Sequence, residues 1–291
     1  MNHKAGFVNI IGNPNVGKST LMNQMVGEKI SIITSKSQTT RHRIMGIVNG
    51  DDFQIVYSDT PGIINPAYRM QESMMNFVSS AFEDADVILY MTDVVETRDK
   101  YPEYLERIKK TETPVLILIN KMDLTPAEKV LELQKAWQEE VPNATVYFIS
   151  ALKNYNVDLV FEHILKLLPE NPPYFPKDQL TDKTERFIVS EIIREKILMN
   201  YKQEIPYSTE VVVESFKEDE KIIRIEATIY VARDSQKGIL IGKKGLALKR
   251  VGQHARQDAE TFFGKQIYLG LYVRVKKDWR DDKHLLRQFG Y

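Results

Sequence analysis

The sequence predicts an α/β protein, in which a doubly wound, mainly parallel sheet is followed by a smaller α+β domain. Over the first 170 residues, short apolar runs alternate with segments of helical periodicity, a pattern typical of parallel sheets covered by helices. The segment "PENPPYFP" (169–176) then places four prolines in eight residues, which stiffens the chain and favours a linker. We therefore expect domains at 1–170 and 181–291, joined by a Pro-rich linker at 171–180.

Five apolar runs are the predicted strands of the first domain, because continuous apolar stretches are typical of strands buried on both faces. They lie at 7–12, 53–62, 86–93, 114–120 and 145–150. The first is followed directly by a helical pattern that ends at Gly27, a residue type common at helix C-caps. Residues 31–43 are polar, rich in hydroxyls and without periodicity, so we expect a mobile loop there.

The second domain is predicted to contain a helix, two strands, a glycine-rich turn, a second helix and a last strand, in that order. The helices lie at 186–201 and 246–263, the two paired strands at 208–216 and 221–233, and the last strand at 266–275. A hairpin flanked by helices is typical of an α+β arrangement.

The composition excludes several classes of site. The 291 residues include no cysteine, which rules out disulfides and thiolate metal sites and agrees with a cytoplasmic location. No apolar run approaches the roughly 20 residues of a membrane-spanning helix, and we expect no cleaved signal peptide.

Charge is distributed unevenly between the two halves of the chain. Residues 1–172 contain 17 Lys and Arg against 22 Asp and Glu, while residues 173–291 contain 23 against 18. The excess of positive charge is concentrated in 237–287. An acidic half and a basic half are expected to bind different ligands.

The segment "GNPNVGKST" (Gly12–Thr20) has the spacing of a phosphate-binding loop between a strand and a helix. Its glycines let successive backbone N–H groups point at one anion, at the positive end of the helix dipole. We expect Lys18 to contact the β- and γ-phosphates and the Ser19 hydroxyl to bind Mg²⁺. The remaining predicted nucleotide contacts of this loop are Asn13, Asn15, Val16, Gly17 and Thr20.

The segment "DTPG" (Asp59–Gly62) follows the second predicted strand. Asp59 is expected to hold Mg²⁺ and the Gly62 N–H to contact the γ-phosphate. Thr40, in the loop between Ser19 and Asp59, is the predicted additional hydroxyl ligand of Mg²⁺. The predicted catalytic residues are thus Lys18, Thr40 and Gly62. Two neighbouring arginines, Arg41 and Arg43, either contact phosphate or are solvated loop residues.

The segment "NKMD" (Asn120–Asp123) predicts the base. The Asp123 carboxylate accepts hydrogen bonds from the N1–H and N2–H₂ groups of guanine, whereas adenine presents an acceptor and a C–H there. Asn120 is expected at the O6/N7 side of the purine, and the Lys121 stem over its ring. "SAL" (Ser150, Ala151 and Leu152) ends the fifth strand, and the Ala151 N–H is a predicted donor to guanine O6. A guanine site is therefore favoured over an adenine site.

One expected residue is absent. Many small GTPases have a glutamine after the DTPG glycine that orients the attacking water, but here Ile63 and Ile64 follow. We expect slow hydrolysis unless another group positions the water. One hypothesis is that Asn15 helps to coordinate K⁺ against the phosphates; the alternative is that it only satisfies the loop backbone.

The basic half contains "ILIGKKGLALKR" (Ile239–Arg250), with a Gly-Lys-Lys-Gly turn between helical segments. Such a turn can hold the backbone of about four nucleotides, as KH domains do. The predicted RNA-binding residues are Ile239, Ile241, Gly242, Lys243, Lys244, Gly245 and Lys249, and the apolar floor under the bases is predicted to include Leu240 and Leu246 as well.

Taken together, these motifs resemble the bacterial Era GTPases, in which a P-loop GTPase domain precedes a type II KH domain. The resemblance covers nearly the whole chain and rests on the phosphate loop, "QTTRHR", "DTPGI", "NKMD", "SAL", "SEIIREK", "IGKKG" and the closing "KKDWRDDKHLLRQFGY". It implies GTP, GDP and Mg²⁺ as ligands and hydrolysis of GTP. It also implies binding of the 3′ region of 16S ribosomal RNA, a role in assembly of the small ribosomal subunit, and peripheral association with the inner membrane. No obligate protein partner is indicated.

Three alternatives remain on the residues alone. An RNA-binding scaffold with a purely structural nucleotide site is disfavoured by intact Lys18, Ser19 and Asp59. A signalling GTPase whose basic C-terminus meets anionic lipid is disfavoured by the Gly-Lys-Lys-Gly turn. A ribosome factor with two GTPase domains is disfavoured because one phosphate loop is present.

Overall fold

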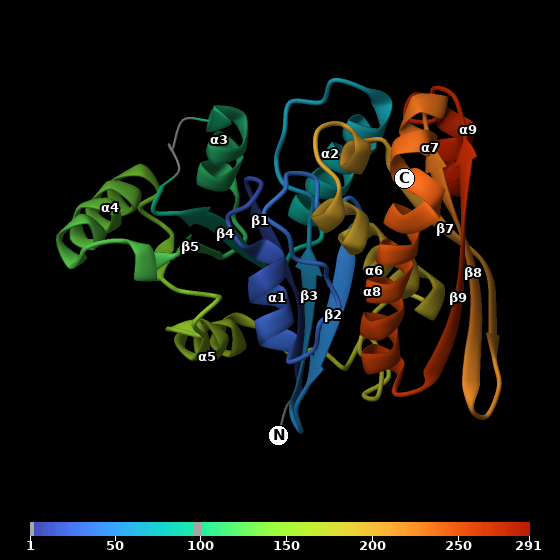
Figure 1. Cartoon of the computed structure of the whole chain (residues 1–291). Coiled ribbons are helices and arrows are strands. Elements are labelled where there is room, and N and C mark those ends of the chain that lie inside the picture. The colour runs from blue at the N-terminus through green and yellow to red at the C-terminus, as the bar shows by residue number, and fades with distance from the viewer. Residues whose placement is uncertain (1–2, 96–99) are drawn as a thin grey trace. The chain divides into compact units, whose positions relative to one another are not determined.

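The computed structural model describes residues 3–95 and 100–291 (Figure 1). The chain divides into two compact units. The first comprises residues up to 31, 40–66 and 74–182, and the second comprises 32–39, 67–73 and 183–291. The segment 171–180 belongs to the first unit, where Ile47 N donates to Leu180 O (2.8 Å) and Gln54 Nε2 to Phe175 O (2.8 Å).

The first unit is built on a six-stranded sheet with the order β2-β3-β1-β4-β5-β6. Its strands are β1 (Lys4–Gly12), β2 (Ile44–Asn49), β3 (Phe53–Asp59), β4 (Val87–Asp93), β5 (Val115–Asn120) and β6 (Thr145–Phe148). All neighbouring strands are parallel except β2, which pairs antiparallel with β3. Strands β4 and β5 are buried along their whole length, because helices cover both faces of the sheet.

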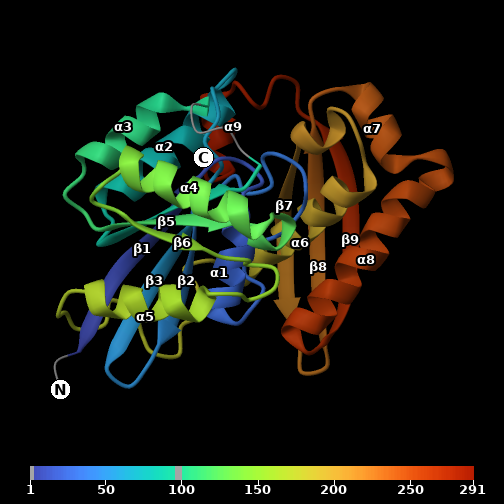
Figure 2. The same ribbon diagram turned by 90° about the vertical axis from the view of Figure 1, so that its left-hand side faces the viewer.

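Five helices belong to this sheet: α1 (Lys18–Val26), α2 (Arg69–Glu83), α3 (Pro102–Lys110), α4 (Ala127–Glu140) and α5 (Val157–Leu167). Helices α1 and α5 lie on one face, and α2, α3 and α4 lie on the other (Figure 2). A short 3₁₀ turn, η2 (Met122–Leu124), follows β5. This arrangement confirms the predicted doubly wound, mainly parallel sheet.

The second unit contains a three-stranded sheet, β7-β8-β9, with helices α6, α7 and α8 on one face. Its elements are α6 (Glu185–Asn200), η3 (Ile205–Tyr207), β7 (Thr209–Glu218), β8 (Ile222–Val231), α7 (Asp234–Ile241), η4 (Lys243–Gly245), α8 (Leu246–Phe263), β9 (Gln266–Val275) and α9 (Lys283–Gln288). Strands β7 and β8 are antiparallel, whereas β8 and β9 are parallel. The α+β prediction is therefore confirmed.

Alternation along β8 and β9 separates an inner from an outer face of this sheet. Ile225, Ala227 and Ile229 on β8 are fully buried against the helices, and Ile267 and Val273 on β9 are nearly so. The residues between them point to the outer face, since successive side chains of a strand alternate. Within the described residues, no helix is long and apolar enough to cross a membrane.

Several elements were not predicted from the sequence, among them strand β2 and helices α7 and α9. Strand β2 was assigned to no element, because its run "IMGIVN" is short and contains a glycine. Helix α7 was treated as part of the glycine-rich turn, since its sequence "DSQKGILI" contains a glycine and has weak helical periodicity.

Candidate functional site

The register of the first sheet brings three predicted motifs to one edge. Ile10 of β1 lies beside Asp59 of β3, and Asp93 of β4 lies beside Asn120 of β5. Both pairs are at the carboxyl ends of their strands. Open α/β sheets bind their ligands at this edge, where the strand order reverses on either side of β1.

The phosphate loop joins β1 to the first turn of α1. Gly17 has φ 103°, and a Cβ there would lie 2.3 Å from the Asn120 amide nitrogen, so only glycine fits. Lys18 is buried, and its Nζ donates to the carbonyl oxygens of Gly12 (2.9 Å) and Asn13 (2.8 Å). The ammonium group is therefore held inside the loop that phosphate would enter.

The three predicted Mg²⁺ ligands meet around one carboxylate. Ser19 Oγ donates to Asp59 Oδ2 (2.7 Å) and lies 2.9 Å from Thr40 Oγ1. Thr40 Oγ1 in turn donates to Asp59 Oδ2 (3.2 Å). The other carboxylate oxygen, Asp59 Oδ1, is buried and accepts no hydrogen bond from residues 3–95 and 100–291. Hydroxyl and carboxylate oxygens are hard ligands that suit Mg²⁺, and the unsatisfied Oδ1 fits a site for a cation.

Burial is the main influence on the pKa of the Asp59 carboxyl group. It raises the pKa of Asp59 above the usual value, and the Lys18 charge and the Ser19 and Thr40 hydroxyls act against it. The pKa in the folded protein exceeds that in the unfolded chain, so this group costs folding free energy once it ionises. That cost is absent at low pH and grows as the pH rises through the folded pKa.

Replacing Asp59 with Asn should therefore stabilise the nucleotide-free protein. We expect a gain of about 1–2 kcal/mol, larger at pH 8 than at pH 5, together with loss of the stabilisation that Mg²⁺ and GDP give wild type. Thermal unfolding at both pH values measures this, with Asp51→Asn at an exposed position as the control. An Asp59→Asn protein less stable than wild type at pH 8 would contradict the burial argument.

Asn120 connects two loops. Its Nδ2 donates to Val16 O (2.7 Å), and its Oδ1 accepts from Ala151 N (2.9 Å). The side chain is buried and joins the phosphate loop to the loop after β6. The sequence assigned Asn120 and the Ala151 N–H to the purine itself, whereas the structure pairs these two groups with each other.

The other predicted base contacts differ in exposure. Lys121 has φ 62°, and its Nζ forms an ion pair with Asp93 (2.5 Å), which holds the lysine stem along the strand edge. Asp123 is exposed, and its carboxylate makes no ion pair among the described residues. Ser150 is buried, and its Oγ accepts from Lys153 N (3.2 Å), whereas Leu152 is 76% exposed. Asp123 is thus the polar group best placed to meet a base.

The residues after Asp59 approach the phosphate loop closely. A Cβ at Gly62 would lie 2.7 Å from Pro14 Cα, so this glycine packs directly on the loop. Ile63 is fully buried, and its N–H donates to Gly12 O (3.2 Å). Asn15 is exposed, with φ 65°.

Arg43 is neither solvated nor directed at phosphate. Its guanidinium forms an ion pair with Asp84 (2.6 Å) and donates to Ser58 Oγ (2.7 Å) and Asn9 Oδ1 (3.2 Å). It therefore fixes the start of β2 to β1, to β3 and to the residue after α2. Arg41 is fully buried as well.

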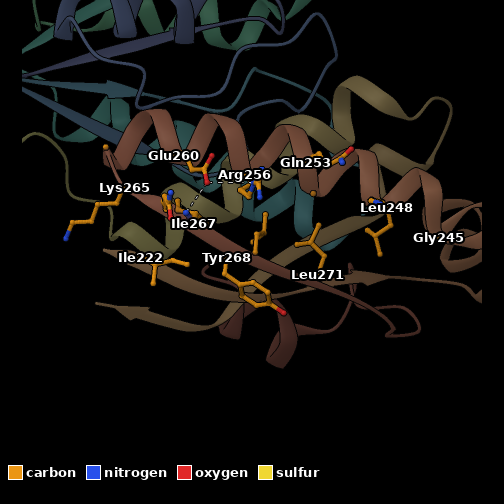
Figure 3. Close-up of a pocket in the computed structure, with 15 residues that line it drawn as sticks. Ile222, Gly245, Leu248, Gln253, Arg256, Glu260, Lys265, Ile267, Tyr268 and Leu271 are labelled. Carbon is orange, nitrogen blue, oxygen red and sulfur yellow. Dashed lines mark hydrogen bonds and ion pairs between the residues drawn. The ribbon is translucent and has the colours of Figure 1, made fainter. Parts of the chain in front are cut away.

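The second unit contains a groove of about 1220 Å³ between α8 and the edge strand β9 (Figure 3). Gly245 and Lys249, two of the predicted RNA-binding residues, line it. The Gly-Lys-Lys-Gly turn lies at one end, where Gly242 (φ 70°) and Gly245 (φ 75°) adopt backbone conformations that glycine favours. Lys243 and Lys244 lie between them, in the 3₁₀ turn η4, which ends at Gly245.

The apolar floor differs from the prediction. Leu240 is fully buried and therefore does not line the groove. Ile239 is 53% exposed and Leu246 is 62% exposed. Ile239 and Ile241 lie in the last turn of α7. Residues 239–241 were expected to line the groove together, but a helix turns adjacent side chains in different directions.

Sequence reasoning missed most of the groove's lining. On α8 it is formed by Leu248, Gly252, Gln253, Arg256 and Glu260, and opposite them by residues 266–269 and Leu271. The spacing of the α8 positions is that of one helical face, so projecting this face from Gly245 onwards would have found them. Arg256 lies 3.8 Å from Glu260, whose Oε1 accepts from Ile267 N (3.1 Å).

Family models match both units. Residues 7–121 match the model described as 50S ribosome-binding GTPase, and residues 204–280 match the KH domain. A GTPase Era from Thermoanaerobacter sp. is 46% identical over all of this chain and 97% of its own length. One from Syntrophus aciditrophicus is 48% identical, covering 99% of this chain and 95% of its own. The chain belongs to the Era family of GTPases.

Solved Era structures have the same fold. One, in complex with MgGDPNP and nucleotides 1506–1542 of 16S ribosomal RNA, matches with a TM-score of 0.95 at 41% identity, covering 99% of each chain. An Aquifex aeolicus Era variant bound to GDP and AlF₄⁻ matches with the same score, identity and coverage. The predicted resemblance and fold class are thereby confirmed.

Proposed function

We propose that this Era-family chain hydrolyses GTP to GDP and phosphate and binds single-stranded RNA from the 3′ region of 16S ribosomal RNA during assembly of the small ribosomal subunit. The observation that carries the proposal is the meeting of the Ser19 and Thr40 hydroxyls at Oδ2 of Asp59, whose other oxygen, Oδ1, is unsatisfied within the described residues, in a chain whose other unit has a basic groove. The Era complex with MgGDPNP and a 16S fragment supports it. We propose residues 1–170 as the catalytic domain, 181–291 as the RNA-binding domain and 171–180 as the linker.

Each residue of the nucleotide site has a separable task. Lys18 leaves the carbonyls of Gly12 and Asn13 to contact the β- and γ-phosphates, and the amides around Gly17 surround the phosphate oxygens. Ser19, Thr40 and Asp59 would hold Mg²⁺, which would neutralise negative charge on the transferring phosphoryl group. Gly62 packs against Pro14, so that its N–H can contact the γ-phosphate. The Asp123 carboxylate accepts the two guanine donors.

Water activation needs a group other than the residue after Gly62. The buried Ile63 has no hydrogen-bonding side chain, and neither has Ile64. We propose that Asn15 holds a monovalent cation against the phosphates. The cation would stabilise the negative charge of the phosphates during hydrolysis, in a site that lacks the water-orienting glutamine. Turnover in K⁺ should then exceed turnover in Na⁺ at equal ionic strength, and Asn15→Ala should remove the difference. Equal phosphate release in the two salts would refute the cation hypothesis.

The groove has the charge and shape for single-stranded RNA. Lys249, Arg256 and Lys265 line it, against the single acid Glu260. The Gly-Lys-Lys-Gly turn can contact the backbone of about four nucleotides. Binding should weaken as salt rises, because cationic side chains release counterions from the phosphates.

Gly245→Asp should reduce RNA binding by at least about tenfold, because a carboxylate would face phosphate in the groove. A Cβ at Gly245 meets nothing within 4 Å, but the φ of 75° strains any residue with a side chain by about 1–2 kcal/mol, so the melting temperature of the variant is measured as well. Gly27→Asp is a matched control, with φ 80° and an equally open position in the first unit. Anisotropy of a labelled 16S 3′-end oligonucleotide measures both. Unchanged RNA affinity for Gly245→Asp would contradict the assignment of the groove.

The two activities are proposed to be linked, so that RNA affinity depends on the bound nucleotide. The test compares RNA affinity in the presence of GDP and of a non-hydrolysable GTP analogue. Equal affinities would refute the link but leave both activities intact.

The proposal includes a cytoplasmic location and peripheral contact with the inner membrane, which rest on the resemblance to Era GTPases. Vesicles of anionic lipid that bind wild type and Gly245→Asp alike would separate lipid contact from RNA binding.

A further inference from the structure

The outer face of the β7–β8–β9 sheet exposes two aromatic rings. Tyr268 is 54% and Tyr272 51% exposed, although both lie within a strand whose neighbouring residues Ile267 and Val273 are buried. Both point to the face turned away from the helices, and Figure 3 shows the Tyr268 ring on the side of β9 opposite α8. Four residues of strand separate the Cα atoms of the two tyrosines by about 13 Å.

Gly270 lies between the two tyrosines on the same face. A Cβ there would meet only ordinary contacts, at 3.7 Å from Glu226 Cγ and 3.8 Å from Ile225 O and Tyr268 Cε1. Packing therefore does not require a glycine at this position. Glycine weakens a strand interior and often marks a place where another molecule approaches closely. No side chain therefore rises from this face of β9 between the two tyrosines, and the Tyr268 ring leans toward the bare Gly270.

The C-terminal segment covers only one end of this face. The Tyr230 ring contacts Phe289 at 5.5 Å between centroids, and Tyr291 donates to Glu210 (2.8 Å). Thr228, on the same face, is accordingly buried. Along β9, by contrast, Tyr268 and Tyr272 remain half exposed, so the part of the face around Gly270 is open.

Charged groups surround the open part in a pattern that suits bases. Arg224 lies beside Tyr268 and Arg274 lies two residues beyond Tyr272, both exposed. Glu226 lies beside Gly270, in the middle. A central carboxylate disfavours phosphate but accepts hydrogen bonds from base amino groups, whereas arginines at the margins suit the backbone.

We propose that this face is a second RNA site, in which Tyr268 and Tyr272 stack on bases of single-stranded RNA and a further base lies over Gly270. The inference rests on the proposed function, because Tyr268 also lines the groove between α8 and β9. A strand that leaves the groove around the edge of β9 therefore reaches Tyr268 first. Stacking on sheet aromatics is how other RNA-binding domains hold unpaired bases.

The test compares two RNAs of 16S 3′-end sequence, one of four nucleotides to fill the groove and one of about ten nucleotides to extend beyond it. Tyr272→Ala should weaken the affinity for the longer RNA by about tenfold. Its affinity for the short RNA should stay within about twofold of wild type. Tyr272→Phe keeps the ring and should bind both RNAs like wild type. Tyr155→Ala, at a 54% exposed tyrosine of the first unit, is the control.

Gly270→Val gives a sharper result, because it fills the space between the rings without disturbing the core. A β-branched residue favours a strand, so the melting temperature should stay equal or rise while affinity for the longer RNA falls about tenfold. If both Tyr272→Ala and Gly270→Val bind the longer RNA like wild type, the second site does not exist. An equal loss for short and long RNA would also overturn it. Failure of wild type to bind either RNA would instead refute the proposed function.

Discussion

Asp123→Asn is expected to weaken GTP binding by at least about 100-fold and to improve binding of xanthosine triphosphate. The carboxylate of Asp123 is exposed beyond β5 and makes no ion pair within the described chain, so it is available to a base. We propose that it accepts hydrogen bonds from guanine N1–H and N2–H₂. The Asn side chain offers one acceptor and one donor group. Its NH₂ group would face the guanine N2–H₂ group, so that two donors would meet and one hydrogen bond would be lost. Xanthine has a carbonyl oxygen at C2, which accepts from that NH₂ group.

Competition titrations with the three triphosphates GTP, ATP and XTP measure the change. Asp158→Asn, an exposed position in the first turn of α5, controls for the loss of one negative charge. The reciprocal gain for XTP distinguishes altered recognition from damage to the fold. An Asp123→Asn protein that keeps wild-type affinity for GTP would show that another residue reads the base.

Lys18→Ala should lower kcat/KM for GTP by about 10²–10³ or more, the range found when one charge-stabilising group is removed from a reaction centre. Lys18 Nζ is buried and held by the carbonyls of Gly12 and Asn13 at the mouth of the phosphate loop. Lys18→Arg should not restore activity, because the planar guanidinium is larger than the ammonium that these two carbonyls surround.

Phosphate release measured at saturating Mg²⁺ tests this prediction. Lys29→Ala, at an exposed lysine after α1, is the matched control and should keep full activity. Melting temperatures of the variants show whether any loss comes from unfolding. Turnover by Lys18→Ala within a factor of ten of wild type would remove Lys18 from the proposed mechanism.

The strand-end motifs were predictable because their residues act locally. The phosphate loop needs Gly17 and Lys18 at fixed spacing, and a parallel sheet brings Asp59 and Asn120 to the edge where that loop ends. Thr40 was predicted from its order in the chain, and the structure brings its hydroxyl to Asp59.

The contacts that were not predicted from the sequence join residues that are distant in the chain. Asn120 pairs with Val16 and Ala151, so the side chain assigned to a base joins two loops. Arg43 pairs with Asp84, 41 residues away. Neither partner can be recognised from local pattern, because tertiary packing decides which of several polar groups is within reach.

The groove illustrates the same limit. The Gly-Lys-Lys-Gly turn marks one end of it, but the strand opposite α8 is set by the parallel pairing of β8 with β9. Which side chains of β9 face the groove follows from that register. Leu240 was misplaced because the run "ILI" before the turn is the end of helix α7.

The most direct test of the account is a competition titration of the nucleotide-free protein with GTP, ITP and ATP in Mg²⁺. Inosine lacks the 2-amino group from which Asp123 is proposed to accept a hydrogen bond. GTP should bind tightest, ITP about tenfold or more weakly, and ATP weaker by further orders of magnitude. Equal affinity for GTP and ITP would contradict the contact to the 2-amino group, and equal affinity for GTP and ATP would contradict a guanine site in this chain.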